Sequence, residues 1–475
     1  MLLYLINPAN PLIGINKTKH NQWNKYRVWQ PLGLMILAGL TPREWDIKII
    51  DENIDNPDYS SKPKPDLVGI TAFTSQAGRA YELALEFRER GVPVVMGGIH
   101  ASMRVEEALE YVDAVVTGEA ESVWNEVLND VLTGNLKRQY KGGYADMNKI
   151  PHARHDLIKG KYKIGSIQTT RGCPLNCSFC SVTPFNGSFH RHRPIEKVVD
   201  EFKTMPEKIA LVVDDNLIGT SKSHIERTKE LFRAMIRAGV KKKWMAQATV
   251  NMADDDELLS LAAKAGCIGV FIGFETATAE GLVEIHKRFN MQNSRNFADS
   301  VAKIKRHGIL VVGSFIMGLD IDEKGIGRKI ADTAIAYGVD LMNVMFLTPF
   351  PGTKLWEKLA GEDRIVTGNF PDDWKYYTLT YPVARYKHLR WQDMLNENRK
   401  CFSTFYSPIR VLRRIFENIC YRRHPFWTVV SNLTVILNAM RFYKKAYKNY
   451  DLTRGSLPEF KKIISKPVLS TIVAE

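Results

Sequence analysis

Hydrophobic and polar positions alternate regularly over residues 1–140. Short apolar runs, rich in valine and isoleucine, are separated by amphipathic stretches such as Ala77–Arg90 and Glu106–Tyr111. The runs are Leu2–Ile6, Asp46–Ile50, Leu67–Thr71, Val92–Met96 and Ala114–Val116. Strand–helix alternation of this kind is typical of a parallel sheet covered by helices on both sides. We therefore predict a doubly wound, Rossmann-like α/β domain over residues 1–140, with ligands binding at the carboxyl ends of its strands.

The pattern is lost around Lys137–His155, where glycine, proline and mixed charges predict a linker over residues 141–160. It returns over residues 161–355, where each apolar run is followed by a helical pattern or a loop. The six predicted strands are Ile164–Gln168, Ile209–Val213, Trp244–Thr249, Gly269–Ile272, Leu310–Met317 and Asn343–Leu347. Repeated βα units predict a full or partial barrel, here a partial (β/α)6 barrel, with function at the carboxyl ends of the strands.

Residues 356–475 no longer alternate in this way and are predicted to be mainly helical. Aromatic and basic residues are mixed there, and between Phe405 and Lys448 the only acidic residue is Glu417. The aromatic and basic residues include Phe405, Tyr406, Arg410, Arg413, Arg414, Phe416, Tyr421, Arg422, Arg423, Phe426, Trp427, Arg441, Phe442, Tyr443, Lys444, Lys445 and Lys448. A helix pair lying on anionic lipid headgroups fits this mixture. RNA binding and a helical cap with a solvated basic face are the alternatives.

Composition changes this picture in one respect. The chain has 475 residues, of which 45% are hydrophobic, as in an ordinary globular protein, but its net charge is +14. Such a charge favours an anionic partner. Because we find no signal peptide and no apolar window of the roughly 18 residues that span a bilayer, we expect a cytoplasmic protein. Peripheral contact with the inner face of the membrane would fit the basic C-terminal region.

The strongest chemical signal is a cluster of cysteines after the first strand of the barrel. Cys173, Cys177 and Cys180 are spaced C-x3-C-x2-C, whereas the other three cysteines of the chain are isolated. Three thiolates on one loop can hold three irons of a [4Fe–4S] cluster and leave the fourth iron open for a substrate or cofactor. A zinc site completed by His190 or His192 is an alternative, as is a chance group of structural cysteines. Disulfides are not expected in a reducing compartment.

This spacing resembles the signature of the radical S-adenosylmethionine (SAM) superfamily. The resemblance implies that SAM chelates the open iron and is cleaved to a 5′-deoxyadenosyl radical. Carboxylates and amides at the strand ends could hydrogen-bond SAM, and the alternative for each acid is a cap on the following helix. Asp214-Asp215-Asn216 and Gly273-Phe274-Glu275-Thr276 match positions that the superfamily uses for SAM. The residues expected at this site are Phe179, which resembles the aromatic residue whose backbone contacts adenine, and Asp214, Asp215, Gln247 and Glu275.

The N-terminal domain resembles the cobalamin-binding domain that precedes the barrel in one class of these enzymes. Its loops Gly97-Gly98-Ile99-His100 and Gly118-Glu119-Ala120-Glu121 follow successive strands. The resemblance implies that cobalamin contacts Gly97, Gly98, His100, Gly118 and Glu119, with His100 in a loop beside the cofactor tail or as a cobalt ligand. The D-x-H-x-x-G motif of other cobalamin proteins is absent, as is usual in this class. A degenerate domain that no longer binds cobalamin is the alternative.

Taken together, these resemblances predict a radical SAM methyltransferase that acts on an unactivated carbon of a hydrophobic or lipid substrate. The C-terminal layout also resembles that of hopanoid methyltransferases. Radical cyclisation, carbon–carbon coupling or desaturation without methyl transfer is the alternative, and an electron donor such as flavodoxin or ferredoxin is expected. Nucleic acid is not the expected partner, because a tRNA methylthiotransferase needs three further cysteines and residues 1–172 contain none. A non-enzymatic iron–sulfur scaffold would leave the acids at the strand ends unexplained.

Overall fold

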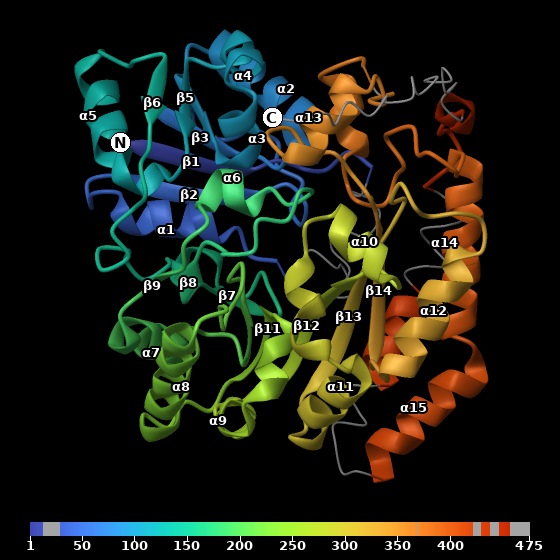
Figure 1. Cartoon of the computed structure of the whole chain (residues 1–475). Helices are drawn as coiled ribbons and strands as arrows, with labels where there is room; N and C mark the ends of the chain where they lie inside the picture. Colours follow the sequence, from blue (N-terminus) through green and yellow to red (C-terminus); the bar gives the residue numbers. More distant parts are fainter. Residues whose placement is uncertain (13–28, 367, 421–428, 438–445, 457–475) are drawn as a thin grey trace, which may run out of the picture.

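The computed structural model describes residues 1–12, 29–366, 368–420, 429–437 and 446–456. Two six-stranded sheets dominate it, one from the N-terminal third of the chain and one from the middle, and the two lie one above the other in Figure 1. Helices α14 (Trp391–Phe405) and α15 (Pro408–Cys420), which follow the second sheet in sequence, run along its outer edge.

The first sheet has the strand order β2-β1-β3-β4-β5-β6, and every neighbouring pair is parallel. Its strands are β1 (Leu2–Asn7), β2 (Asp46–Asp51), β3 (Leu67–Thr71), β4 (Val94–Gly97), β5 (Ala114–Thr117) and β6 (Gln139–Lys141). Side chains of β1 alternate between two cores: Tyr4 and Ile6 face one, and Leu3 and Leu5 face the other. Helices therefore cover both faces of the sheet, which confirms the doubly wound prediction.

The helices of this part divide between the two faces. Apolar side chains of α2 (Ala77–Glu89), α3 (Gly98–Met103) and α4 (Val105–Tyr111) pack in the first core. Those of α1 (Leu32–Leu40) and α5 (Trp124–Thr133) pack in the second.

Two segments of this part differ from the prediction. Gly98 begins helix α3, so the Gly97–His100 segment is not wholly a loop. Strand β6 ends at the first residue of the segment predicted as a linker, and beyond β6 this segment packs Ala145, Met147 and Ile150 into the second core. Neither feature has a local signal, because each is stabilised by contacts with distant parts of the chain.

The second sheet has the order β14-β13-β12-β11-β10-β7 and is also entirely parallel. Its strands are β7 (Gly165–Ile167), β10 (Ile209–Val212), β11 (Lys243–Ala248), β12 (Cys267–Glu275), β13 (Leu310–Met317) and β14 (Leu341–Phe346). The six predicted strands are confirmed. Within the described residues β7 and β14 form the two edges, so the barrel is open.

Helices α7 to α13 connect and follow these strands. Their bounds are α7 (Ile195–Thr204), α8 (Lys222–Arg237), α9 (Asp256–Lys264), α10 (Ala279–Glu284), α11 (Phe297–Arg306), α12 (Ile326–Tyr337) and α13 (Lys354–Gly361). Oxygen-bearing side chains cap several of them: Ser221 accepts from the His224 backbone at α8, and Asp255 accepts from Leu258 at α9. Between β7 and β10 the chain inserts a short antiparallel hairpin, β8 (Thr170–Arg171) and β9 (Arg191–His192), with helix α6 (Val182–Asn186) between its strands.

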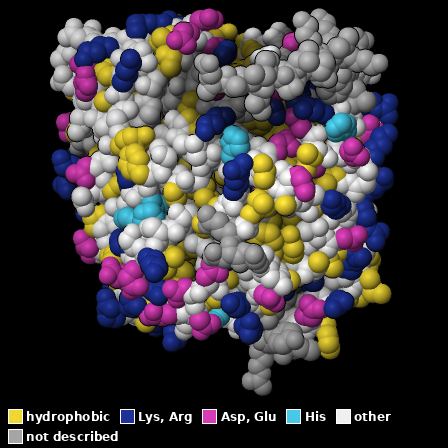
Figure 2. All heavy atoms as spheres, in the orientation of Figure 1, with side chains coloured by type: hydrophobic (Ala, Val, Ile, Leu, Met, Phe, Trp, Pro, Cys, Tyr) yellow, Lys and Arg dark blue, Asp and Glu magenta, His cyan; other side chains and the backbone are white. Residues whose placement is uncertain are grey.

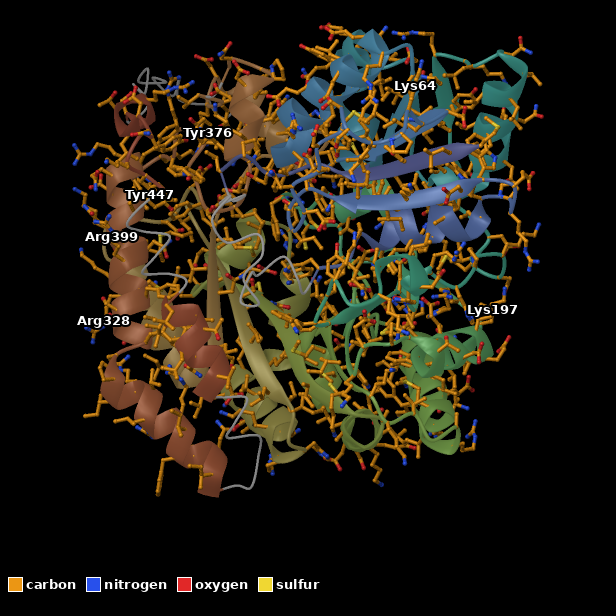
Figure 3. The ribbon with its side chains drawn as sticks, turned by 180° about the vertical axis from the view of Figure 1, so that it is seen from behind. Lys64, Lys197, Arg328, Tyr376, Arg399 and Tyr447 are labelled. Carbon is orange, nitrogen blue, oxygen red and sulfur yellow. The ribbon has the colours of Figure 1, made fainter. Side chains whose placement is uncertain are left out.

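From residue 391 onward the C-terminal region is mainly helical where the structure describes it, as predicted, whereas residues 362–366 and 368–390 are largely irregular. It contains α14 (Trp391–Phe405), α15 (Pro408–Cys420) and a helical segment over residues 429–437. Helix α14 packs along α12, and Arg328 of α12 and Arg399 of α14 project outward from this edge (Figure 3). No helix among the described residues is long and apolar enough to cross a membrane. The predicted residues Tyr421, Arg422, Arg423, Phe426, Trp427, Arg441, Phe442, Tyr443, Lys444 and Lys445 lie outside the described residues.

Candidate active site

A cavity of about 440 Å³ lies between the first sheet and the hairpin that carries the cysteine loop. The order of the first sheet reverses at β1 and β3, and ligands of open α/β sheets bind at such a reversal, beyond the carboxyl ends of the strands. From this sheet the cavity is lined by Asn7, Thr71, Gly97, Gly98, Gly118 and Glu119. From the other side it is lined by Gln168, Arg171, Ser181, Val182, Phe185, Asn186 and Asp215. The cavity thus brings together residues predicted to bind cobalamin and one, Asp215, predicted to bind SAM.

Two of the predicted glycines are required by the local backbone. Gly98 has a φ of +87°, and a Cβ atom there would lie 2.6 Å from the Thr71 hydroxyl oxygen. Gly118 has a φ of +69°, and a Cβ atom there would lie 2.5 Å from the Gly142 carbonyl oxygen. Both glycines line the cavity, so bare backbone is presented to whatever fills it. A large cofactor with polar groups at its edge fits such a surface.

Glu119 also lines the cavity, but its carboxylate is held by two arginines of the cysteine hairpin. Arg171 lies 2.8 Å from one oxygen, Arg191 pairs with the other, and the Ala145 backbone N–H donates to the carboxylate at 2.8 Å. Burial alone would raise the pKa of Glu119, but the hydrogen bond from Arg191 and the charge of Arg171 lower it overall. Glu119 therefore fastens the cysteine hairpin to the first sheet.

His100 is placed differently from the prediction. It is fully buried and is not among the residues that line the cavity. Its Nε2 atom lies 3.0 Å from the Tyr81 hydroxyl and 3.3 Å from the Glu107 carboxylate, and its ring packs edge-on against Trp374. The Trp374 indole also donates to Glu107. His100 thus belongs to a buried polar network that joins the N-terminal part to the segment after the barrel.

The cysteine loop is tied to the rest of the barrel through its backbone. The Cys173 N–H donates to the Gly187 carbonyl, and the Cys180 N–H donates to the Cys177 carbonyl. The Ser178 N–H donates to Ile285 after α10, and the Ser178 carbonyl accepts from Leu355 in α13. Two helices distant in sequence therefore hold the loop in shape. By contrast, Cys267 and Cys401 are buried elsewhere, on β12 and α14.

Burial disfavours the free thiolate form of the three cysteines. Burial raises the pKa of Cys177 to about 11 and that of Cys180 to about 12, and a bound iron displaces such protons. Burial also raises the pKa of Cys173, and the Asn216 side chain lies near this thiol. The Nδ2 atom of Asn216 is buried and has no hydrogen-bond partner among the described residues. A thiolate sulfur at Cys173 would supply the acceptor that this amide needs, so the loop fits a [4Fe–4S] cluster.

The two aspartates after β10 hold the strands around this loop. Asp214 is fully buried and accepts from the backbone and hydroxyl of Thr169, and burial raises its pKa to about 6. Asp215 accepts from the Gly172 N–H at 2.8 Å and from the Asn186 amide at 3.0 Å. Neither aspartate caps α8, whose cap is Ser221. Asp215 reaches the cavity, whereas Asp214 does not line it.

Glu275 is paired with a lysine that sequence reasoning missed. Its backbone is left-handed, with a φ of +70°, and its carboxylate lies 2.5 Å from Lys287 Nζ, which also donates to the Gly273 carbonyl. Lys287 lies close enough to Cys177 to act to lower its pKa. Lys287 follows a short helix without motif or periodicity, so the sequence offered no signal for it. Non-glycine residues in this conformation cluster at functional sites.

Gln247 and Phe179 complete the predicted set, and neither lines the cavity between the sheets. Gln247 is exposed on β11, directly beside Phe271 of β12. Phe179 is half-buried and packs against the main core. Of the predicted residues, Gly97, Gly98, Gly118, Glu119 and Asp215 thus line the cavity, and Phe179, Asp214, Gln247, Glu275 and His100 do not.

Two family comparisons match the parts that form this site. Residues 167–326 match the Radical SAM superfamily, and residues 25–128 match the B12 binding domain. The first range contains the three cysteines, Asp214, Asp215, Gln247 and Glu275, and the second contains the glycine loops of the cavity.

Relatives of known sequence match most of the chain. An uncharacterized methyltransferase of Pyrococcus horikoshii is 30% identical over 422 residues, covering 82% of this chain and 90% of that protein. Bacteriochlorophyllide d C-12(1)-methyltransferase of Chlorobaculum tepidum is 28% identical and covers 82% and 85%. Hopanoid C-2 methylase of Rhodopseudomonas palustris is 27% identical and covers 83% and 75%.

Solved structures share the fold. The cobalamin-dependent SAM radical enzyme OxsB, with aqua-cobalamin and SAM bound, has a TM-score of 0.65 at 14% identity, covering 88% of this chain and 68% of that one. The radical SAM methyltransferase TsrM from Kitasatospora setae, with cobalamin and a [4Fe–4S] cluster bound, has a TM-score of 0.59 at 20% identity, covering 76% and 78%.

Proposed function

Because this chain belongs to the radical SAM superfamily, in its cobalamin-dependent methyltransferase family, we propose that it methylates an unactivated carbon of a hydrophobic, lipid-type substrate. The cofactors of this family are a [4Fe–4S] cluster, SAM and cobalamin. When bound, the cluster and SAM supply the radical that removes hydrogen, and cobalamin supplies the methyl group. The observation that carries the proposal is the cavity itself, which opens between the carboxyl ends of the first sheet and the cysteine hairpin.

The residues of the chain take three roles in this proposal. Cys173, Cys177 and Cys180 hold the cluster, and Gly97, Gly98 and Gly118 seat cobalamin with their bare backbone. Asp215 holds the cysteine loop by accepting from the Gly172 N–H. Glu275 holds the SAM side of the site through its ion pair with Lys287. The ion pairs of Glu119 with Arg171 and Arg191 fix the distance between the two halves.

A hydrophobic substrate is supported by the relatives. Two relatives are named for bacteriochlorophyllide d and for a hopanoid. Much of the cavity wall away from the glycine loops is apolar, through Leu5, Leu32, Leu34, Ile36, Leu37 and Trp124. Such a wall suits the apolar faces of a large ring-shaped cofactor, in keeping with the cobalamin assigned to this cavity.

We also propose that helix α15 brings the enzyme to an anionic membrane surface, from which such a substrate could be drawn. Its exposed apolar side chains follow helical spacing, with Ile409 77%, Leu412 65%, Phe416 66% and Ile419 54% exposed. Arg413, 80% exposed at its side chain, lies on the same helix. An exposed apolar stripe with arginines beside it is the layout of a helix that lies in the headgroup region.

The membrane proposal is tested by sedimentation with vesicles that contain anionic lipid. Leu412→Glu together with Phe416→Glu should reduce the bound fraction severalfold, because the apolar contact is lost and negative charge is added. Leu132→Glu is the matched control, since Leu132 is 53% exposed on α5. Equal binding by all three proteins would contradict the proposal.

The reaction is tested with SAM whose methyl group carries deuterium. The reconstituted enzyme is incubated anaerobically with this SAM, a flavodoxin or ferredoxin reductant and a membrane-lipid extract. We expect 5′-deoxyadenosine together with a lipid product that has gained a deuterated methyl group. A lipid that is consumed without gaining the label would contradict methyl transfer and favour cyclisation, coupling or desaturation.

A further inference from the structure

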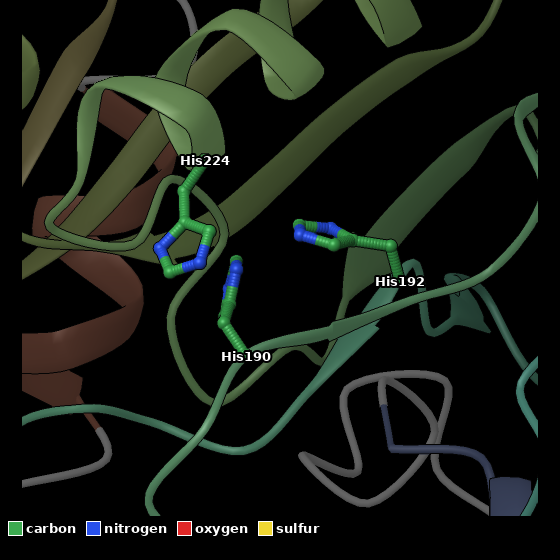
Figure 4. Close-up of side chains that lie close together, drawn as sticks. All are labelled: His190, His192 and His224. Atoms are coloured by element: carbon green, nitrogen blue, oxygen red, sulfur yellow. The ribbon is translucent and has the colours of Figure 1, made fainter.

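Three histidines meet beside the hairpin that carries the cysteine loop. His190 precedes β9, His192 ends β9, and His224 lies in the first turn of α8. One nitrogen from each ring lies within 4.8 Å of the others, and the ring centroids are 4.6 to 5.7 Å apart. Figure 4 shows the three rings converging on one point from two separate segments. Histidine side chains also gather at the surface of Figure 2, at the level of β9 in Figure 1.

The tautomer of His190 is fixed by its hydrogen bond. Its Nε2 atom lies 2.6 Å from the Asn216 carbonyl oxygen, which can only accept. The ring proton is therefore on Nε2, and Nδ1 carries a lone pair. This Nδ1 atom is buried and has no hydrogen-bond partner among the described residues, and His190 as a whole is only 9% exposed. A buried acceptor of this kind calls for a ligand.

The second member of the group, His224, has no hydrogen bond to another described residue that fixes its tautomer. His224 Nδ1 is buried and also has no partner in the part of the chain that the structure describes. Neutral imidazole is the form of histidine that binds metal.

We propose that His190, His192 and His224 bind a zinc ion. Three neutral imidazoles without a carboxylate or thiolate form a donor set that suits borderline divalent metals and not magnesium or calcium. Zinc–nitrogen bonds of about 2.0 to 2.1 Å place tetrahedral ligands about 3.3 Å apart, so small rotations of these side chains would close the site. His192 and His224 are partly exposed, which leaves an entry path and a fourth position for water.

The ion would brace the hairpin behind the iron–sulfur site. It would link β9 to the start of α8, two segments that flank the cysteine loop and β10. Asn216 connects the two sites, because its carbonyl fixes His190 while its side chain faces Cys173. The positive charge of Arg227 nearby works against a dication, so three direct bonds are needed to hold it.

The test measures zinc in the cluster-loaded protein, so that the cysteines are occupied by iron. Protein purified without a polyhistidine tag is equilibrated with zinc, desalted and analysed for metals. We expect one zinc per chain, and the zinc X-ray absorption spectrum should contain nitrogen or oxygen at about 2.0 Å and no sulfur at about 2.3 Å. This readout does not depend on methyl transfer, so it is separable from the proposed function.

The variants His192→Ala and His224→Ala should lower zinc affinity at least about 100-fold, because loss of even an outer partner of a metal ligand costs about 10- to 100-fold. His388→Ala is the control, since His388 is exposed on another part of the chain. Iron content should be unchanged in all three variants, which establishes that they are folded. Absence of zinc from the wild type, equal affinity in the His192 and His224 variants, or a sulfur shell would each overturn the proposal.

Discussion

The substitution Glu119→Gln tests whether the two halves of the site are fastened by one buried carboxylate. Removing one partner of a buried ion pair costs about 3 to 5 kcal/mol, because the other charge is left uncompensated. Glu119 is 4% exposed and serves two arginines. The glutamine carbonyl can still accept one hydrogen bond, and Arg171 keeps Glu121 at 2.8 Å. We therefore expect a loss of about 2 to 3 kcal/mol in the free energy of unfolding.

The assay is urea unfolding of both proteins at several pH values. The folded-state pKa of Glu119 is lowered from its ordinary 4.5. The carboxylate therefore stabilises the fold fully above this value, and the contribution is lost as the pH falls through the folded-state pKa. The difference between wild type and Glu119→Gln should be constant around neutral pH and should shrink in acid below 4.5.

A surface pair supplies the matched control. Glu126 and Lys137 are 48% and 57% exposed at their side chains, so Glu126→Gln should cost no more than about 1 kcal/mol. The reasoning is refuted if Glu119→Gln costs no more than this control. It is also refuted if the difference between Glu119→Gln and wild type stays the same in acid.

Further substitutions separate the two cofactor sites. Gly98→Val should reduce the cobalt content and leave the iron content unchanged, because the valine side chain would collide with Thr71 at the cavity. Gly134→Val is the control: a Cβ atom there meets no neighbour within 4 Å, so both metals should stay in place. Lys287→Met should slow SAM cleavage and destabilise the fold by about 3 to 5 kcal/mol, because it strands the buried Glu275 carboxylate; wild-type stability would contradict this. Replacing Cys173, Cys177 and Cys180 with alanine should remove iron and abolish SAM cleavage but leave the cobalt content unchanged. Retained cleavage would contradict their assignment as ligands of the cluster.

The sequence pattern predicted the strands of both sheets closely, because each is a short buried run between helical segments. The prediction of Leu67–Thr71 and that of Leu310–Met317 match β3 and β13 residue for residue. Helix α1 was not predicted, because Leu32–Leu40 is almost uniformly apolar and has no polar face to reveal a helical period. Strand β6 was missed because its three residues depend on pairing with β5.

The cysteines and the glycine loops could be singled out as candidate site residues from the sequence, since they lie in local motifs. Pairings across the chain could not be predicted in the same way. Glu119 and Arg191 are 72 residues apart, and only the fold brings them together. His100 belongs to a motif that we expected at the cofactor, but it is buried and its Nε2 atom contacts Tyr81 and Glu107 instead. His224 likewise joins His190 and His192 only in three dimensions.

The most direct test of the account is metal analysis of the whole chain after anaerobic reconstitution with iron, sulfide and hydroxocobalamin, followed by desalting. The account predicts one cobalt and about four irons per chain, because the cavity binds cobalamin and the cysteine loop binds the cluster in the same molecule. Gly98→Val should then retain iron and lose cobalt. Iron without cobalt in the wild-type protein would contradict the central claim that this cavity is a cobalamin site.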